Sequence, residues 1–179
     1  MTSRKDELDE KPIEVIPLPT TDGRLIVIAI DHSEHADTTI QFALDGFINP
    51  NTDKVMLLNV RPSLQNHLYL ELGYHHTPHI SPENIQKLVQ YEGKRSVELL
   101  NKKAALFLEK NIKIGAYSLV GDARYALEEK INELHPSCVL VGSRGLGVIQ
   151  STILGSVSKY LLHHLNYPVT LVPPKPKSN

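Results

Sequence analysis

A stretch rich in glycine and serine, GSRGLGVIQSTILGS (142–156), follows directly on the apolar run SCVLV. Gly142, Gly145 and Gly155 stand at intervals of three and ten residues, and Ser156 and Ser158 open an expected helix. Glycine lets the backbone approach a ligand closely. The free N–H groups and the positive dipole end of a helix N-terminus favour an anion. The stretch therefore predicts a phosphate-binding site.

Neither standard nucleotide-binding loop occurs in the chain. The P-loop requires Gly-Lys-Ser or Gly-Lys-Thr, which is absent, and Gly145 and Gly147 are followed by Gln150 where the dinucleotide fingerprint needs glycine. On their own, glycines after a strand are usually turn residues, and serines there would cap any helix. The position of the stretch in the fold therefore has to decide between a turn and a binding site.

Strands and helices are expected to alternate along the chain. Continuous apolar runs predict strands that are buried in a parallel sheet. Apolar residues at helical spacing predict the intervening helices, one starting at Ser81 and Pro82 and one capped by Asp122. The expected strands are 24–30, 54–60, 112–121, 137–142 and 168–172, and the expected helices start after 31–34, at 81–82, at 122 and near 156.

This alternation predicts a single-domain α/β fold, an open doubly wound parallel sheet of five strands in the order 3-2-1-4-5 with helices on both faces. Ligands of such sheets bind beyond the carboxyl ends of the strands, where the winding reverses. That point lies between the first and fourth expected strands, where Asp31 follows the first strand and Gly142 stands at the end of the fourth. The glycine-rich stretch therefore starts where a ligand is expected.

The two ends of the chain are expected to be tails. Residues 1–22 are charged and then interrupted by prolines, and residues 174–179 are rich in proline and lysine. The folded domain is predicted to span 23–173. The first residues contain no hydrophobic region typical of a secretory signal, and no apolar run is long enough to cross a bilayer. We therefore expect a cytoplasmic protein.

The overall composition narrows the possible partners. The formal net charge of −1 gives no basic field for nucleic acid or for an anionic membrane surface. The single cysteine, Cys138, excludes an internal disulfide and lies in an apolar run, which predicts a buried thiol. Small molecules and other proteins remain as the expected partners.

The spacing G-x2-G-x9-G-S, together with a first strand followed by Asp31 and a last strand in YPVTLV, resembles the ATP-binding branch of the universal stress protein family. The resemblance covers about residues 24–173. It implies that ATP is bound, with Asp31 and the backbone at Val60 meeting adenosine and Val141 packing nearby. Ala29 stands where some relatives have proline, and His32 makes the turn bulkier than the commoner Asp-Gly-Ser. The residues that the resemblance places at the phosphates and ribose are Gly142, Arg144, Gly145, Gly155, Ser156, Val157 and Ser158.

Several of these residues have a simpler interpretation. Asp31 could cap the first helix, with Glu34 imitating a capping box. Arg144 could be a solvated loop charge rather than a charge-assisted donor to phosphate. Residues 148–154 are expected to be mobile without nucleotide and ordered by it. Mg²⁺ would be held through the ATP phosphates, with Ser156, Ser158 or Thr152 supplying hydroxyl groups.

The chemistry favours a binding module over an enzyme. Phosphoryl transfer needs a metal held by protein groups and a residue that orients the attacking group. Asp31 is the one acidic residue that the sequence places at the site, so no catalytic residue is assigned. We therefore expect a stress-response or signalling module with a conformational output. A slow ATPase or adenylate-processing enzyme and a nucleotide-free interaction protein are the alternatives.

The histidine-rich segment offers the components of a metal site. His67, His75, His76 and His79 lie close in sequence, and imidazole binds zinc or copper. Neither the complete ligand set nor the fixed geometry of a closed site can be identified, so an ordinary loop is favoured and no metal is assigned. His163 and His164 are consecutive on a helix and point to different sides, so they cannot form one ligand pair.

The last expected strand, 168–172, should lie at an edge of the sheet. Its residues Val169, Leu171 and Val172 are apolar, and an open strand of this kind tends to pair with another chain. We therefore predict a homodimer through antiparallel pairing of this strand, which the family resemblance also implies. The alternative is that the N-terminal sequence IEVIPL covers this edge.

Overall fold

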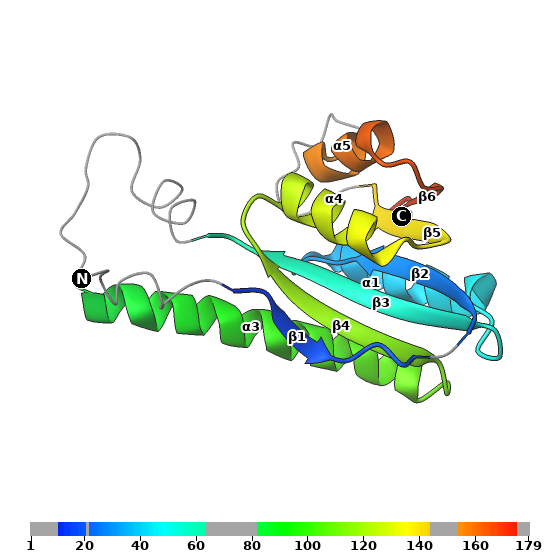
Figure 1. Cartoon of the computed structure of the whole chain (residues 1–179), viewed down its shortest axis with the longest axis horizontal. Coiled ribbons are helices and arrows are strands. Elements are labelled where there is room, and N and C mark those ends of the chain that lie inside the picture. The colour runs from blue at the N-terminus through cyan, green and yellow to red at the C-terminus, as the bar shows by residue number, and fades with distance from the viewer. Residues whose placement is uncertain (1–10, 21, 64–81, 144–153, 175–179) are drawn as a thin grey trace, which may run out of the picture.

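The computed structural model describes residues 11–20, 22–63, 82–143 and 154–174. These residues form one six-stranded sheet with helices on both faces (Figure 1). Helix α3 is the longest described helix, with 27 residues. The strands are β1 (Ile13–Ile16), β2 (Arg24–Ala29), β3 (Asp53–Arg61), β4 (Lys113–Val120), β5 (Cys138–Gly142) and β6 (Val169–Val172). The helices are α1 (Glu34–Phe42), the π-helical turn η1 (Ala43–Phe47), α3 (Pro82–Leu108), α4 (Ala123–Leu134) and α5 (Ser156–His164).

The strands follow the order β1-β4-β3-β2-β5-β6. Strands β2 to β6 are parallel and take the predicted order, since β2 lies between β3 and β5. The prediction of five strands is wrong, because β1 adds a sixth strand, antiparallel to β4. This strand lies inside segment 1–22, for which we expected no regular structure.

Burial of apolar side chains explains why β1 forms. Val15 and Ile16 pack against the hydrophobic cluster that contains Ile26, Ile28 and Phe107. This burial offsets the conformational entropy that is lost when a short strand is ordered. Pro17 follows directly and cannot donate to the ladder, so the strand ends at Ile16. The segment then passes close over β4, since a Cβ atom added to Gly115 would lie 2.9 Å from Leu18 Cα.

The position of β1 also decides where the N-terminal segment lies. It pairs with β4 at one edge of the sheet, whereas β6 lies at the other edge. The Arg61 Nη2 group donates to the Lys11 carbonyl at 3.0 Å and holds the start of this segment near the carboxyl end of β3. The alternative in which IEVIPL covers the edge of the last strand is therefore wrong.

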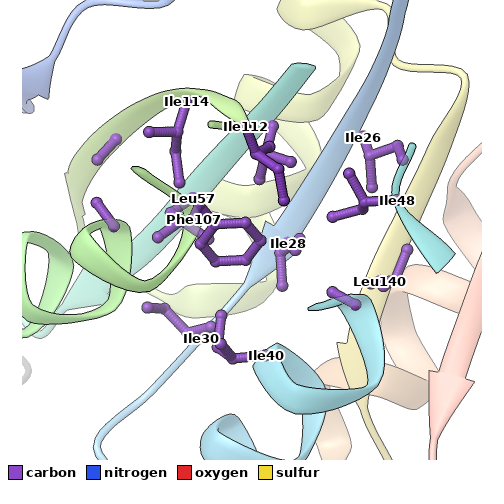
Figure 2. Close-up of a cluster of buried hydrophobic side chains, with 14 of the residues drawn as sticks. Ile26, Ile28, Ile30, Ile40, Ile48, Leu57, Phe107, Ile112, Ile114 and Leu140 are labelled. Atoms are coloured by element: carbon purple, nitrogen blue, oxygen red, sulfur yellow. The ribbon is translucent and has the colours of Figure 1, made fainter. Parts of the chain in front are cut away.

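Alternating residues of β2 serve two separate hydrophobic layers, as strand geometry requires. Ile26 and Ile28 belong to the cluster that contains residues of α1 and α3. Figure 2 shows the ring of Phe107, from α3, among the strand side chains of this cluster. Val27 and Ala29 belong to the cluster on the opposite face, which contains residues of α4 and α5. The central strands are thus buried on both faces.

Two local predictions from the sequence can be compared with the structure. Asp122 caps α4 as expected, because its side chain accepts a hydrogen bond from Arg124 N. Helix α3 begins at Pro82, and Ser81 lies outside the described residues. In the part of the chain that the structure describes, no helix combines the length and the apolar character needed to cross a membrane.

Candidate functional site

The carboxyl ends of β2 and β5 lie side by side at the point where the sheet reverses its winding. Ala29 is paired in register with Val141 of β5 and with Leu58 of β3. Ala29 and Val141 also share one hydrophobic cluster, against which Val60 and Val157 pack. The structure therefore brings four of the predicted site residues together on the α4 and α5 face of the sheet.

The turn that follows β2 is organised by Asp31. Its Oδ1 atom accepts hydrogen bonds from the backbone N–H of Ser33, at 3.0 Å, and from the Ser33 hydroxyl. Ser33 is the N-cap residue of α1, which begins at Glu34. The proposed capping box from Asp31 to Glu34 is thus not how this helix starts. Asp31 instead shapes the turn before the cap, and it is half-buried at the predicted ligand position.

The end of β5 is tied to the start of α5 by two hydrogen-bonded residues. The Ser143 carbonyl accepts from the Gly155 N–H at 2.7 Å, and the Ser143 N–H donates to the Val172 carbonyl at 2.8 Å. The Ser158 hydroxyl lies within hydrogen-bonding distance of the carbonyls of Gly155 and Ser143, at 3.0 and 3.3 Å. Ser158 is only 2% exposed, so in this structure its hydroxyl stabilises the junction.

The N-terminus of α5 has the character expected of an anion site. The Lys159 N–H donates to the Gly155 carbonyl at 2.9 Å, and the N–H groups of Ser156 to Ser158 precede this first intrahelical bond. The first turn contains no acidic residue, and Ser156 is exposed. The positive end of the helix dipole is therefore not neutralised by a carboxylate of its own first turn.

His32 lies in the Asp31 turn and is half-buried. Burial lowers the pKa of His32, and the charge of Arg95 on α3 lowers it further, whereas Glu92 and Asp31 act in the opposite direction. The lowered pKa keeps the imidazole neutral at pH 7, where its ring offers one donor and one acceptor. The residue that replaces the commoner glycine thus adds hydrogen-bonding capacity beside Asp31, and not a positive charge.

A buried polar group on the opposite face of the sheet was missed at the level of sequence. The Asn59 side chain bonds to the Ile30 carbonyl, and Ser96 of α3 joins Asn59 to Ser118 of β4. The one signal was the interruption of two apolar runs, by Asn59 in KVMLLNV and by Ser118 in IKIGAYSLV. These interruptions lie far apart in the chain, and only the fold brings them together.

Several predicted features fall outside the described residues. They are Arg144, Gly145, residues 148–153 of the loop expected to be mobile, and the histidines at 67, 75, 76 and 79. Cys138 is buried, as predicted, and His163 and His164 are exposed on α5. Within the described ranges, no group of three or more His, Cys, Asp or Glu side chains is arranged to hold a metal ion.

Comparison with known proteins gives a consistent result. A sequence model described as the universal stress protein family matches residues 24–173. The chain is 27% identical to the universal stress protein A-like protein of Arabidopsis thaliana over 140 residues, which cover 74% of each chain. It is 30% identical over 168 residues to the universal stress protein PHOS32 of the same plant, with 87% of this chain and 67% of that protein covered. A crystal structure of an Arabidopsis thaliana universal stress protein family member with AMP bound superposes with a TM-score of 0.60 at 19% identity, covering 85% of this chain and 92% of that one.

Proposed function

This chain belongs to the universal stress protein family, and we propose that it binds an adenine nucleotide, ATP, at the carboxyl ends of β2 and β5. The junction between β5 and α5 carries the proposal. Its hydrogen bond from Gly155 to Ser143 fixes the positive end of α5 at the carboxyl end of β5. Ala29 and Val141 are paired in register, and Asp31 and Ser143 each lie two residues further along the chain. The Asp31 turn and the start of α5 therefore lie together at the carboxyl ends of the strands.

The adenosine and the phosphates would bind to different parts of this site at the carboxyl ends of β2 and β5. Adenosine would lie at the Asp31 turn and the main chain of Val60, over the small side chain of Ala29. The phosphates would lie at the N-terminus of α5, beside Gly142 and Ser156. The family resemblance adds Arg144 and Gly145 to the phosphate end, and both lie outside the described residues. Mg²⁺ would be held through the phosphates. The AMP bound to the Arabidopsis thaliana relative supports adenine as the base.

The output that we propose is conformational, as in a stress-response or signalling module. Asp31 is committed to the Ser33 turn through Oδ1, which suits a ligand-positioning role better than that of a general base. Phosphate release measured with Mg²⁺-ATP tests this directly. Turnover of about 1 per second or faster would place the protein among ordinary enzymes and would overturn the choice of a binding module.

A matched pair of substitutions tests the phosphate end of the site. Ser156→Asp adds a carboxylate to the exposed first turn of α5, where it should stabilise the empty helix by about 0.3–1 kcal/mol and repel the phosphates. Ser137→Asp adds the same charge at an exposed position before β5, at the opposite end of the strand. We expect Ser156→Asp to weaken ATP binding with little effect on adenosine binding, and we expect Ser137→Asp not to weaken ATP binding.

Calorimetric titration of the wild type and both variants with Mg²⁺-ATP and adenosine gives the answer. Equal loss of affinity for ATP and adenosine in Ser156→Asp would contradict the placement of the phosphates. No binding of either ligand to the wild type at millimolar concentration would contradict the function itself. Mass spectrometry of material released from the purified, denatured protein would show independently whether a nucleotide is carried along.

We also propose a homodimer through β6. This strand lies at one edge of the sheet. Three of its four residues are only half-buried, and two of these three, Val169 and Leu171, are apolar. The N-terminal strand lies at the other edge and does not compete for this position. Leu171→Pro removes a backbone donor, so sedimentation should show a monomer. A wild type that already sediments as a monomer at micromolar concentration would contradict the dimer.

A further inference from the structure

Three polar side chains form a continuous buried chain beneath the carboxyl ends of β2, β3 and β4. Asn59 Nδ2 lies 2.8 Å from the Ile30 carbonyl oxygen, and the Ser96 hydroxyl lies 2.6 Å from Asn59 Oδ1. The Ser118 hydroxyl lies 2.7 Å from that of Ser96. The exposures of Asn59, Ser96 and Ser118 are 3%, 1% and 0%, so water does not compete for these groups.

The direction of each hydrogen bond in this row of three side chains follows from the bond between Asn59 and the Ile30 carbonyl. A carbonyl oxygen can only accept, so the atom of Asn59 that faces Ile30 must be the amide nitrogen and the atom that faces Ser96 must be the oxygen. The single proton of Ser96 is therefore donated to Asn59. Ser118 must then donate its own proton to Ser96. The carboxamide of Asn59 is thus held in one orientation by α3.

The carbonyl that Asn59 holds marks the end of pairing between two strands. The register of β2 and β3 ends at Ala29 and Leu58, followed by one more bond from the Ile30 N–H to the Leu58 carbonyl at 2.9 Å. Strand β3 continues along β4 as far as Arg61. In a continued parallel ladder, the Ile30 carbonyl would accept from the N–H of Val60. The carboxamide of Asn59 supplies a donor to this carbonyl in place of the ladder.

We propose that Asn59 is a positioning residue of the nucleotide site, and that it acts by ending the β2–β3 ladder at Ile30. Its carboxamide holds the peptide that leads into the Asp31 turn and leaves the main chain of Val60 to adenosine. Ser96 and Ser118 fix Asn59, and through them the position of α3 is coupled to the site. This inference rests on the proposed function and assigns a role to residues that do not touch the ligand.

Replacement of Asn59 by leucine provides a test with an unusual sign. A side chain with a purely structural role would, when removed, loosen its neighbours and speed their amide exchange. If Asn59 ends the ladder, Asn59→Leu instead lets the Val60 N–H bond to the Ile30 carbonyl. We therefore expect slower hydrogen exchange at the Val60 amide, measured by NMR on the ligand-free protein.

Binding measurements provide the second readout. We expect Asn59→Leu to weaken adenosine and Mg²⁺-ATP by the same factor, between about twofold and about tenfold, because the change acts at the adenosine end. Ser96→Ala should cause a smaller loss in the same direction, and it serves as the second variant if Asn59→Leu does not fold. Ile114→Val, a buried change in β4 near its amino end, controls for loss of stability and should leave both affinities unchanged.

The outcomes separate this inference from the proposed function. A wild type that binds neither adenosine nor ATP overturns the proposed function, and with it the role of Asn59 in the site. A wild type that binds both ligands, with unchanged affinities in Asn59→Leu and Ser96→Ala, overturns the role of Asn59 alone. Faster or unchanged exchange at the Val60 amide in Asn59→Leu also overturns it, whatever the affinities are.

Discussion

The ion pair between Arg24 and Asp53 leads to a prediction whose size can be worked out from its geometry. Asp53 accepts hydrogen bonds from Arg24 Nε at 3.1 Å, Arg24 Nη2 at 2.7 Å, Asn49 N at 2.8 Å and Thr52 Oγ1 at 3.2 Å. Its side chain is 2% exposed, whereas that of Arg24 is 46% exposed. The pair joins β2 to β3 at their amino ends, far from the candidate site.

The unequal burial predicts that the two single substitutions have unequal costs. In Asp53→Asn, the remaining oxygen can face Asn49, and the freed guanidinium of Arg24 can turn into water. The loss is then chiefly that of charge-assisted bonds, and we expect about 2–3 kcal/mol of unfolding free energy. In Arg24→Met, a nearly buried carboxylate loses its cation. Such a change costs about 3–5 kcal/mol, and we expect the lower half of this range because Thr52 and Asn49 still donate.

The pH dependence of these costs has a definite sign. Burial raises the pKa of Asp53, but the hydrogen bonds from Arg24, Asn49 and Thr52 outweigh burial and lower this pKa below its usual value. The unfolded carboxyl titrates near about 3.9. The stabilisation is therefore complete above that pH and is lost as the pH falls through the lower, folded pKa. The difference between wild type and Asp53→Asn should accordingly narrow at acidic pH.

Urea denaturation followed by circular dichroism from pH 7 to pH 3 measures these differences. Asp45→Asn is the control, since Asp45 is exposed and accepts one hydrogen bond from Gln41. This change should stay within about 0.5 kcal/mol of the wild type. A loss at pH 7 that is no larger in Asp53→Asn than in Asp45→Asn would refute the reasoning. So would a difference between wild type and Asp53→Asn that stays constant down to pH 3.

Three further predictions concern individual side chains. Gly23 and Gly46 both have positive φ, at 134° and 127°, but only at Gly23 would an added Cβ lie 2.4 Å from a backbone carbonyl oxygen. Gly23→Ala should therefore lower the melting temperature more than Gly46→Ala. Equal losses would contradict this. Gly115→Ala should speed proteolysis within residues 11–20 before global unfolding, because its Cβ would lie 2.9 Å from the backbone of this segment; unchanged cleavage would show that the segment adapts. The pKa of Tyr160 is raised to about 12, chiefly by its hydrogen bond to Glu128. Glu128→Gln should lower this pKa towards about 10 in an NMR titration that follows the Tyr160 ring, whereas a value that stays near 12 would exclude Glu128 as the cause.

Local patterns were sufficient for the order of the parallel strands. Continuous apolar runs identify strands that are buried on both faces, and the intervening helices require parallel connections. β1 could not be predicted in the same way. It has only four residues, prolines lie on both sides of it, and its stability comes from β4 and the core cluster, which are distant in sequence. For such a strand, tertiary contacts decide the structure.

The candidate site was predicted unevenly for a similar reason. The strand ends and the start of α5 follow from the fold class, so the positions of Asp31, Val141 and Gly155 on these elements could be predicted from the sequence. Their contacts with a nucleotide stay predictions. The partners of polar side chains could not. Sequence alone left open whether Asp31 caps α1, and the structure answers that it bonds to Ser33. The family resemblance places Ser158 at the phosphates and ribose, which stays a prediction, whereas its hydrogen bonds to two backbone carbonyls could not be read from the sequence.

The alternation of side chains along β3 explains how two neighbouring residues act on opposite faces of the sheet. Asn59 and Val60 are neighbours in β3, so their side chains point to opposite faces of the sheet. Val60 packs with Ala29 and Val141 beside α5, where we propose the nucleotide binds, whereas Asn59 lies on the side of α3 and bonds to Ser96. A displacement of α3 would therefore move the Asn59 carboxamide and, through the Ile30 carbonyl, the Asp31 turn. In the proposed module this route lets α3 and the nucleotide influence each other across the sheet, and linkage requires the influence to be reciprocal.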